Sequence, residues 1–135
     1  AFDPGVTTGY IIKRDGPLLT GQLQGEHHAG LWCMLHDFQP DIVICESFTY
    51  QRRGNVVLKS VEYIGVISLY CQSTNTPLRM QSPSQAKNLW TDEKLKAVNL
   101  YKGNSPHSND ATRHLLYYLT VHVKDMYWIN LLREE

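Results

Sequence analysis

Residues 38–48 read Phe-Gln-Pro-Asp-Ile-Val-Ile-Cys-Glu-Ser-Phe, and this stretch decides the fold class. Asp41 to Cys45 is a nearly continuous apolar, β-branched run, which is typical of a strand covered on both faces of a sheet. Such a strand brings Glu46 to its carboxyl end. We therefore expect a rigid element to position this carboxylate.

The flanking segments predict further strands and helices around this strand. Asp3-Pro4-Gly5 fits the end of a first strand, and residues 8–13 and 18–23 are β-compatible runs separated by the turn signal at 15–17. Apolar residues recur at helical spacing on both sides of the strand. The remaining predictions are helices over 27–38 and 56–72, a strand over 78–80, helices from Pro83 and over 92–101, a loop over 102–107, and a last helix from Asn109.

This order of elements predicts the fold class. We expect a single α/β domain over residues 1–135, with a mixed five-stranded sheet flanked by helices. A three-stranded antiparallel meander would come first and parallel strands would follow. The carboxyl ends of the strands are then the favoured place for a functional site.

Composition limits the function less than the pattern does. Lys plus Arg and Asp plus Glu are 13 each, so a DNA-binding surface would need local segregation of charge. No apolar run approaches the roughly 20 residues of a membrane helix, and Ala1-Phe2-Asp3 does not resemble a secretory signal. Cys33, Cys45 and Cys71 are far apart and odd in number, which favours reduced core thiols in a cytoplasmic protein.

Three acidic residues occupy positions that suggest chemistry. Asp3 stands at a strand end, Glu46 ends the apolar strand and Asp110 begins a helix. Each also has an ordinary explanation, as a turn residue, a surface residue or a helix N-terminal acid. Carboxylates gathered on adjacent strands would repel one another and raise their own pKa values unless a multivalent cation neutralised them. Hard oxygen ligands favour Mg²⁺ or Mn²⁺.

Three segments together resemble a known family. Residues 2–10 (FDPGVTTGY) are similar to the opening strand of the RuvC-type Holliday-junction resolvases, members of the RNase H-like superfamily. Residues 38–48 resemble the strand of that family that carries its second acid, although Phe48 comes one position early. Residues 107–111 (HSNDA) resemble its closing signature, in which an acid followed by Ala opens the last helix. The likeness runs along nearly the whole chain.

The resemblance implies an RNase H-like sheet and a metal-dependent endonuclease. Residue by residue, it implies metal binding and catalysis by Asp3, Glu46 and Asp110, and a catalytic or ligand role for His107. Two Mg²⁺ or Mn²⁺ ions roughly 4 Å apart would bracket the scissile phosphate and leave 5′-phosphate and 3′-hydroxyl ends. His107 and Asp110 can face the same side if one helical turn includes both. The five other histidines carry no motif, and we interpret them as surface or core residues.

DNA contacts are expected beside Glu46 and on two later segments. The loop after Glu46 combines aromatic and basic groups that can stack on an exposed base and neutralise phosphates. The candidates are Phe48, Tyr50, Arg52, Arg53, Lys59 and, by the resemblance, Lys87 and Lys94. The resemblance also implies a homodimer through helix 56–72, a cytoplasmic location in a bacterial or phage-infected cell, and no membrane. Ordinary alternatives are a core aromatic at Phe48, solvated faces for the lysines and a core face for helix 56–72.

Other functions fit parts of the pattern. The neutral charge balance and short chain allow a broader structure-selective nuclease acting on flaps and forks, or a binding module without activity. Asp3-x-Gly5-x-Thr7 also matches the phosphate loop of sugar kinases and actin-like ATPases. Those proteins need a second lobe and an adenosine site, for which 135 residues leave no room.

Overall fold

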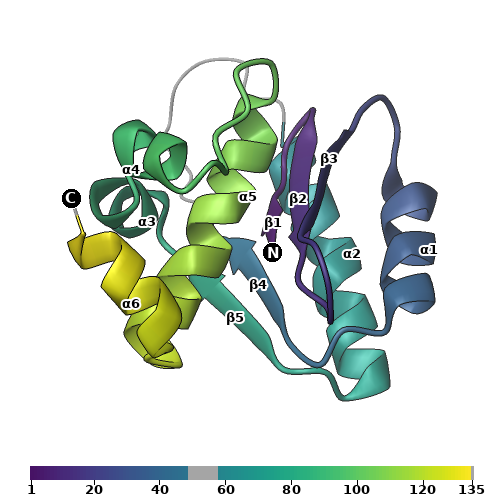
Figure 1. The fold of residues 1–135 in the computed structure, drawn as a ribbon. Coiled ribbons are helices and arrows are strands. Elements are labelled where there is room, and N and C mark those ends of the chain that lie inside the picture. Colours follow the sequence, from purple (N-terminus) through teal and green to yellow (C-terminus); the bar gives the residue numbers. More distant parts are fainter. Residues whose placement is uncertain (49–57, 135) are drawn as a thin grey trace.

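One mixed sheet of five strands forms the centre of the computed structural model, which describes residues 1–48 and 58–134. The strands lie in the order β3-β2-β1-β4-β5 (Figure 1), with β1 at Phe2–Asp3, β2 at Thr8–Ile12, β3 at Leu19–Leu23, β4 at Val43–Glu46 and β5 at Leu78–Gln81. β1, β2 and β3 pair antiparallel, whereas β1 with β4 and β4 with β5 pair parallel. The predicted meander followed by parallel strands is confirmed.

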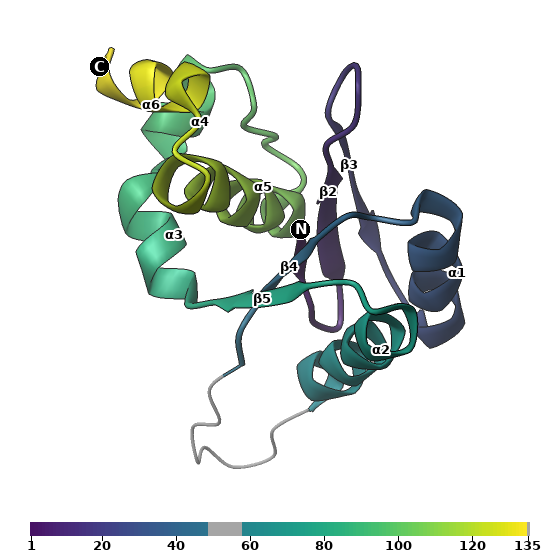
Figure 2. The same cartoon turned by 90° about the horizontal axis from the view of Figure 1, so that it is seen from below.

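Helices cover both faces of this sheet. α1 (His28–Phe38) and α2 (Lys59–Thr74) lie on one face, and α5 (Pro106–Tyr117) lies on the other, as the turned view shows (Figure 2). α3 (Pro83–Leu89), α4 (Asp92–Ala97), the π-helix η1 (Tyr118–His122) and α6 (Met126–Arg133) lie on the α5 side.

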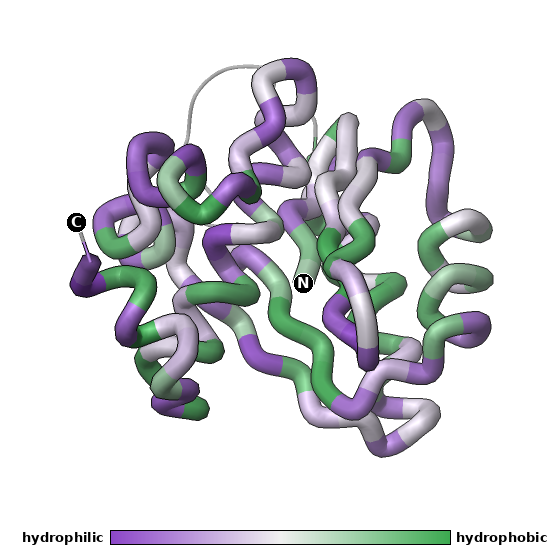
Figure 3. The backbone as a smooth tube through the Cα atoms, viewed as in Figure 1, coloured by the Kyte–Doolittle hydropathy of each residue, from purple (hydrophilic) through white to green (hydrophobic). Residues whose placement is uncertain are grey.

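Alternating strand residues supply two hydrophobic cores. On the side of α1 and α2, Phe2, Val43 and Cys45 pack with helical residues that include Leu31 and Ile67. On the side of α5, Ile11 and Ile44 pack with a second set, which includes Trp90, Leu95, Leu115 and Leu116. β4 therefore contributes to both cores, as its apolar run predicts, and its tube is hydrophobic until it reaches its carboxyl end (Figure 3).

Gly9 allows α5 to approach the sheet closely. It pairs with Asp3 in the register of β1 and β2. A Cβ at this position would overlap the backbone of His107 and Ser108, in the first turn of α5. The absence of a side chain thus lets the start of α5 lie directly beside the end of β1.

The order of strands and helices agrees with the sequence prediction, and the differences concern particular boundaries. α4 ends at Ala97 and not at Tyr101, because Asn99 adopts a left-handed conformation (φ 61°) that closes the helix. The segment 102–107 is not wholly a loop, since α5 begins at Pro106 and includes His107. The helical pattern from Asn109 to Val123 continues as the π-helix η1, and α6 was not predicted.

Two further predictions concern cysteines and membranes. Cys45 and Cys71 are buried and unpaired as expected, but the prediction of a core thiol is wrong for Cys33, which is exposed on the outer side of α1. Within residues 1–48 and 58–134, no helix has the length and apolarity needed to cross a membrane.

Candidate active site

The three predicted acids come from three elements that meet at one end of the sheet. Asp3 ends β1 and Glu46 ends the parallel neighbour β4, so both carboxyl groups emerge at the same edge. Asp110 lies in α5, the helix that Gly9 admits against β1 and β2. His107 is one turn earlier in α5, and its Nδ1 lies 3.2 Å from Oδ2 of Asp3. α5 therefore brings both of its predicted site residues towards the strand ends.

Each acid also contacts a basic side chain. Besides the pair of Asp3 with His107, Nε2 of His114 lies 2.9 Å from Oε2 of Glu46. Asp110 accepts a hydrogen bond of 2.6 Å from Arg113, and Nζ of Lys87 lies 3.8 Å from its other oxygen.

The pKa values show that the acids influence one another. Burial, and then the charges of Glu46 and Asp110, raise the pKa of Asp3 from 3.8 to about 8. Burial also raises the pKa of Asp110, and Glu46 adds to this while Lys87 opposes it. For Glu46, burial is the largest influence and acts upward, but the contacts with His114, Asp3 and Lys87 together outweigh it and hold the pKa below its ordinary value. Asp3 therefore keeps a proton at neutral pH between two negative neighbours.

This donor set fits a divalent cation in its chemistry. Three partly buried carboxylates offer hard oxygen ligands, and a cation would replace the proton that Asp3 now holds. Among the residues that the structure describes, however, no three His, Cys, Asp or Glu side chains already converge as a metal site. Asp110 is hydrogen-bonded to Arg113 and Glu46 to His114, so each of these carboxylates has a protein partner in this structure.

The predicted DNA-binding residues fall into different surroundings. Lys87 lies at the acids, and its charge acts on Asp3, Glu46 and Asp110 alike. Phe48 is exposed two residues after Glu46, so the alternative of a core aromatic is wrong.

Two other predicted lysines make local contacts. Lys59 pairs with Glu26 at 2.9 Å and with Glu62 at 3.5 Å, near the start of α2. Lys94 donates to the carbonyl oxygen of Leu89, at the end of α3. The predicted Tyr50, Arg52 and Arg53 lie outside the described residues.

Three residues of this region were not singled out from the sequence. His114 is 1% exposed and contacts Glu46, and Gln81 of β5 contacts His114 in turn. Arg113 joins Asp110 to Asp92 and to the carbonyl oxygen of Trp90. His114 and Arg113 follow Asp110 by four and three residues, and this helical spacing is the signal that could have indicated them.

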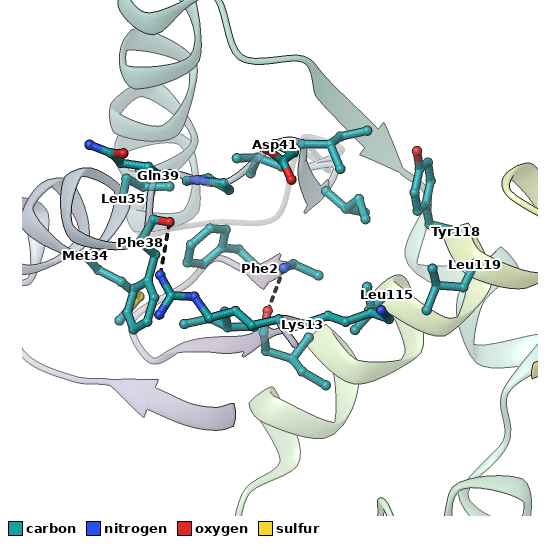
Figure 4. A pocket seen from close by; sticks show the side chains of 18 of the residues that line it. Phe2, Lys13, Met34, Leu35, Phe38, Gln39, Asp41, Leu115, Tyr118 and Leu119 are labelled. Carbon is teal, nitrogen blue, oxygen red and sulfur yellow. Dashed lines mark hydrogen bonds between the residues drawn. The ribbon is translucent and has the colours of Figure 1, made fainter. Parts of the chain in front are cut away.

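One cavity lies at the opposite end of the strands. It has a volume of about 630 Å³ and is lined by the start of β4, the end of β2 and the later part of α5 (Figure 4). None of the three acids lines it. A smaller, polar pocket of about 450 Å³ lies beside Asp110, with Lys87, Tyr101 and Arg113 in its wall. Of these two pockets, only the smaller one is lined by one of the three acids.

Comparison with known proteins places this geometry in a structural context. No protein-family model and no curated protein sequence matches the chain. Among solved structures, Thermus thermophilus RuvC in complex with a Holliday junction substrate is similar over 90% of this chain and 93% of its own, with 20% identity and a TM-score of 0.65.

A viral structure shows the same likeness. The fowlpox virus resolvase in complex with Holliday junction DNA is similar over 89% of this chain and 97% of its own, with 15% identity and a TM-score of 0.54. The five-stranded mixed sheet and its flanking helices thus match across nearly the full length of both proteins. The chain has the RNase H-like fold of the Holliday-junction resolvases.

Proposed function

We propose that this chain is a Mg²⁺- or Mn²⁺-dependent endonuclease that cleaves branched DNA, with the four-way Holliday junction as its substrate. The observation that carries the proposal is that Asp3, Glu46 and Asp110 lie at one end of a sheet of this fold, near enough to act on one another's pKa values. The similar structures from T. thermophilus and fowlpox virus were both solved with Holliday junction DNA.

The four site residues have separate roles in this proposal. Asp3, Glu46 and Asp110 would hold the ions. Asp3 is the least replaceable, because the charges of both other acids act on its pKa. The bound ions would supply an activated hydroxide and stabilise the leaving 3′ oxygen, so that products carry 5′-phosphate and 3′-hydroxyl ends. His107 lies against Asp3 with its side chain partly exposed, where it can orient or deprotonate the attacking water.

Lys87 and Phe48 define the side from which DNA would approach. Lys87 is more than half exposed while its ammonium group reaches Asp110, so it can exchange this carboxylate for a phosphate oxygen. A phosphate at Lys87 would lie beside the acids. Phe48 offers an exposed ring two residues beyond Glu46 on which an unpaired base at the branch point can stack.

A substrate comparison tests the proposed function. Cleavage of a four-way junction, a flap, a fork and a linear duplex is measured with Mg²⁺, with Mn²⁺ and with EDTA. We expect metal-dependent cutting, fastest on the junction, with ends that DNA ligase can seal. Equal cleavage rates on the junction, the flap and the fork would indicate a broader structure-selective nuclease instead of a resolvase. The absence of cutting on all four substrates would contradict a nuclease.

Asp3→Asn tests the assignment of the acids within this experiment. Because the amide is a poor ligand for Mg²⁺ but nearly isosteric, we expect cleavage to fall at least about 10³-fold while junction affinity measured in EDTA stays within about threefold. Asp41→Asn, at the other end of β4, is the matched control and should cut normally. An Asp3→Asn variant that cuts at the wild-type rate would remove Asp3 from the site.

A homodimer through α2 completes the proposal, because two active sites related by twofold symmetry suit the two strands cut at a junction. The core side of α2 buries Tyr63, Ile67 and Tyr70. Its outer side exposes apolar side chains at helical spacing. Between them, a Cβ built at Gly65 would meet no atom of the described residues within 4 Å outside the helix's own backbone. The exposed apolar side chains are Leu58, Val61 and Leu69, which are 43%, 46% and 59% exposed.

Sedimentation of a double variant tests the dimer. Val61→Lys with Leu69→Lys places like charges on the outer side of α2 without touching the core, so we expect the dimer to dissociate at micromolar concentration. Met126→Lys with Tyr127→Lys, on the exposed side of α6, is the control and should sediment as the wild type does. A wild-type chain that stays monomeric at high concentration, with or without junction DNA, would contradict this part of the proposal.

A further inference from the structure

His114 connects the buried polar interior of α5 to Glu46. Its ring is 1% exposed, and Nε2 lies 2.9 Å from Oε2 of the carboxylate. On its other side, Nδ1 lies 3.0 Å from Nε2 of Gln81. Gln81 stands opposite Glu46 in the register of β4 and β5. The contacts thus run from Glu46 on β4, through His114 on α5, to Gln81 on the adjacent strand β5.

The contacts of Gln81 define which ring nitrogen carries the proton. Its amide nitrogen also lies 3.0 Å from the backbone carbonyl oxygen of His114, to which it donates. A reversed amide would place its oxygen against that carbonyl, so the donor orientation is the stable one. Nδ1 of His114 therefore accepts a hydrogen bond from the amide of Gln81, and Nε2–H donates a hydrogen bond to Glu46.

In this arrangement, one buried polar atom of Gln81 has no hydrogen bond to a described residue. This atom is Oε1, the oxygen of the side-chain amide. An unsatisfied buried acceptor lowers stability, and an apolar residue at this position would avoid that loss. Packing alone does not explain why the strand carries a glutamine here. An orienting role for its amide does.

We propose that His114, oriented by Gln81, is a positioning residue that holds the Glu46 carboxylate in place for the divalent cation. The inference rests on the proposed function, because the ion is the reason that Glu46 needs a defined orientation. Histidine–carboxylate pairs of this kind act behind metal ligands by fixing their geometry, and their loss typically weakens metal affinity about 10- to 100-fold. His114 itself would not touch the substrate.

Two substitutions at position 114 separate orientation from packing. His114→Leu keeps the approximate volume and removes the donor, so we expect Mn²⁺ binding, measured by calorimetry on the free protein, to weaken about tenfold or more. His114→Gln places an amide N–H where Nε2 now lies and should restore affinity to within about threefold of wild type. Junction affinity in EDTA should stay unchanged in both variants, because His114 is buried away from the DNA.

A control histidine and a second position protect the test from loss of folding. His27→Gln alters a buried histidine that contacts Thr8 on the side of α1 and α2, and it should bind Mn²⁺ as the wild type does. If His114→Leu does not fold, Gln81→Met, which keeps the ring but removes its orienting donor, should weaken Mn²⁺ binding about threefold or more. Normal Mn²⁺ affinity in a folded His114→Leu or Gln81→Met variant would overturn the proposal.

The outcomes distinguish this inference from the proposed function. Weakened Mn²⁺ binding in His114→Leu together with rescue by His114→Gln supports the positioning role even if the wild-type protein cuts none of the DNA substrates. Wild-type cleavage of the junction combined with unchanged Mn²⁺ affinity in both position-114 variants would overturn the positioning role and leave the nuclease intact.

Discussion

Helices α2 and α5 pack on opposite faces of one sheet but bury different kinds of side chain. α2 buries Tyr63, Ile67, Tyr70 and Cys71 in a largely apolar core. α5 buries apolar residues as well, but between residues 108 and 114 it also places polar and charged side chains in the interior, namely Ser108, Asn109, Thr112, Arg113 and His114. Every one of these groups needs a hydrogen-bond partner, whereas on the core side of α2 only the tyrosine hydroxyls do, as in the bond from Tyr63 to the carbonyl oxygen of Gly25.

The difference indicates what each helix contributes. Polar groups that are buried and paired cost more to arrange than apolar ones, so the presence of Arg113 and His114 in α5 is best explained by the acids that they contact. His114 and Arg113 reach Glu46 and Asp110 directly. The apolar contacts of α2 have no such target. We therefore expect substitutions along α5 to change activity and substitutions in the core side of α2 to change stability alone.

The largest effect is expected where α5 meets the sheet. In Gly9→Ala, the new methyl group would overlap the backbone of His107, and backbone cannot move aside as a flexible side chain can. We expect the free energy of unfolding to fall by about 4 kcal/mol, with cleavage lost in any protein that folds. Urea denaturation and the junction assay measure the two effects. A stable, active variant would show that α5 does not depend on this close approach.

A somewhat smaller effect on stability is expected at the centre of the other face. Ile67→Ala creates a cavity beneath α2, where the side chain is fully buried, and should lower the free energy of unfolding by about 3 kcal/mol. Because Ile67 belongs to the hydrophobic core on the side of α1 and α2, away from α5, the cleavage rate per folded molecule should stay within about twofold of wild type. A large loss of cleavage rate in the folded fraction would show that the core side of α2 also affects activity, which would contradict the proposed difference between α2 and α5.

The two faces also differ in how far the sequence predicts them. The apolar run ending at Glu46 and the helical spacing around Ile67 are local patterns, and both elements formed where those patterns indicated. The contact of His114 with Glu46 joins residues 68 positions apart. No local sequence pattern can indicate a contact between residues so far apart along the chain, because the contact depends on how α5 packs against β4.

Some elements of the site were still predictable because a motif covered them. Asp3, Glu46, His107 and Asp110 each stand in a segment that resembles the resolvases, and the structure brings these four towards one end of the sheet. His114 and Arg113 look like members of an ordinary helix until their partners are known. α6 was missed for a related reason, since it has no fully buried residue and lies on the surface of the second core.

Asp3→Asn is expected to raise the free energy of unfolding in the absence of divalent metal, by an amount smaller than the losses in Gly9→Ala and Ile67→Ala. The folded protein keeps the Asp3 proton up to about pH 8, whereas an ordinary aspartate loses it near 3.8. Between these values the unfolded state has released a proton that the folded state retains, so the contribution of Asp3 to the free energy of unfolding falls as pH rises. Asparagine mimics the protonated acid and removes this loss.

The size of this effect can be measured as a difference between the two proteins. We expect Asp3→Asn to exceed the wild type by about 2 kcal/mol in free energy of unfolding at pH 8 and to match it near pH 4. Added Mg²⁺ should stabilise the wild type at pH 8 and leave the variant unchanged. A gap that is constant with pH would show that Asp3 has an ordinary pKa in the folded protein.

The smallest effect is expected at the second glycine of the comparison, Gly65 on the outer side of α2. Among the described residues, no atom outside the helix's own backbone lies within 4 Å of a Cβ built there, so Gly65→Ala meets no obstacle of the kind that Gly9→Ala meets. Alanine loses less backbone entropy than glycine in a helix interior, and the variant should be more stable by about 0.5–1 kcal/mol. Thermal unfolding at a concentration where the chain is monomeric isolates this gain from association. A loss of stability there would mean that the outer side of α2 is packed in the monomer, and it would remove the surface on which the proposed dimer depends.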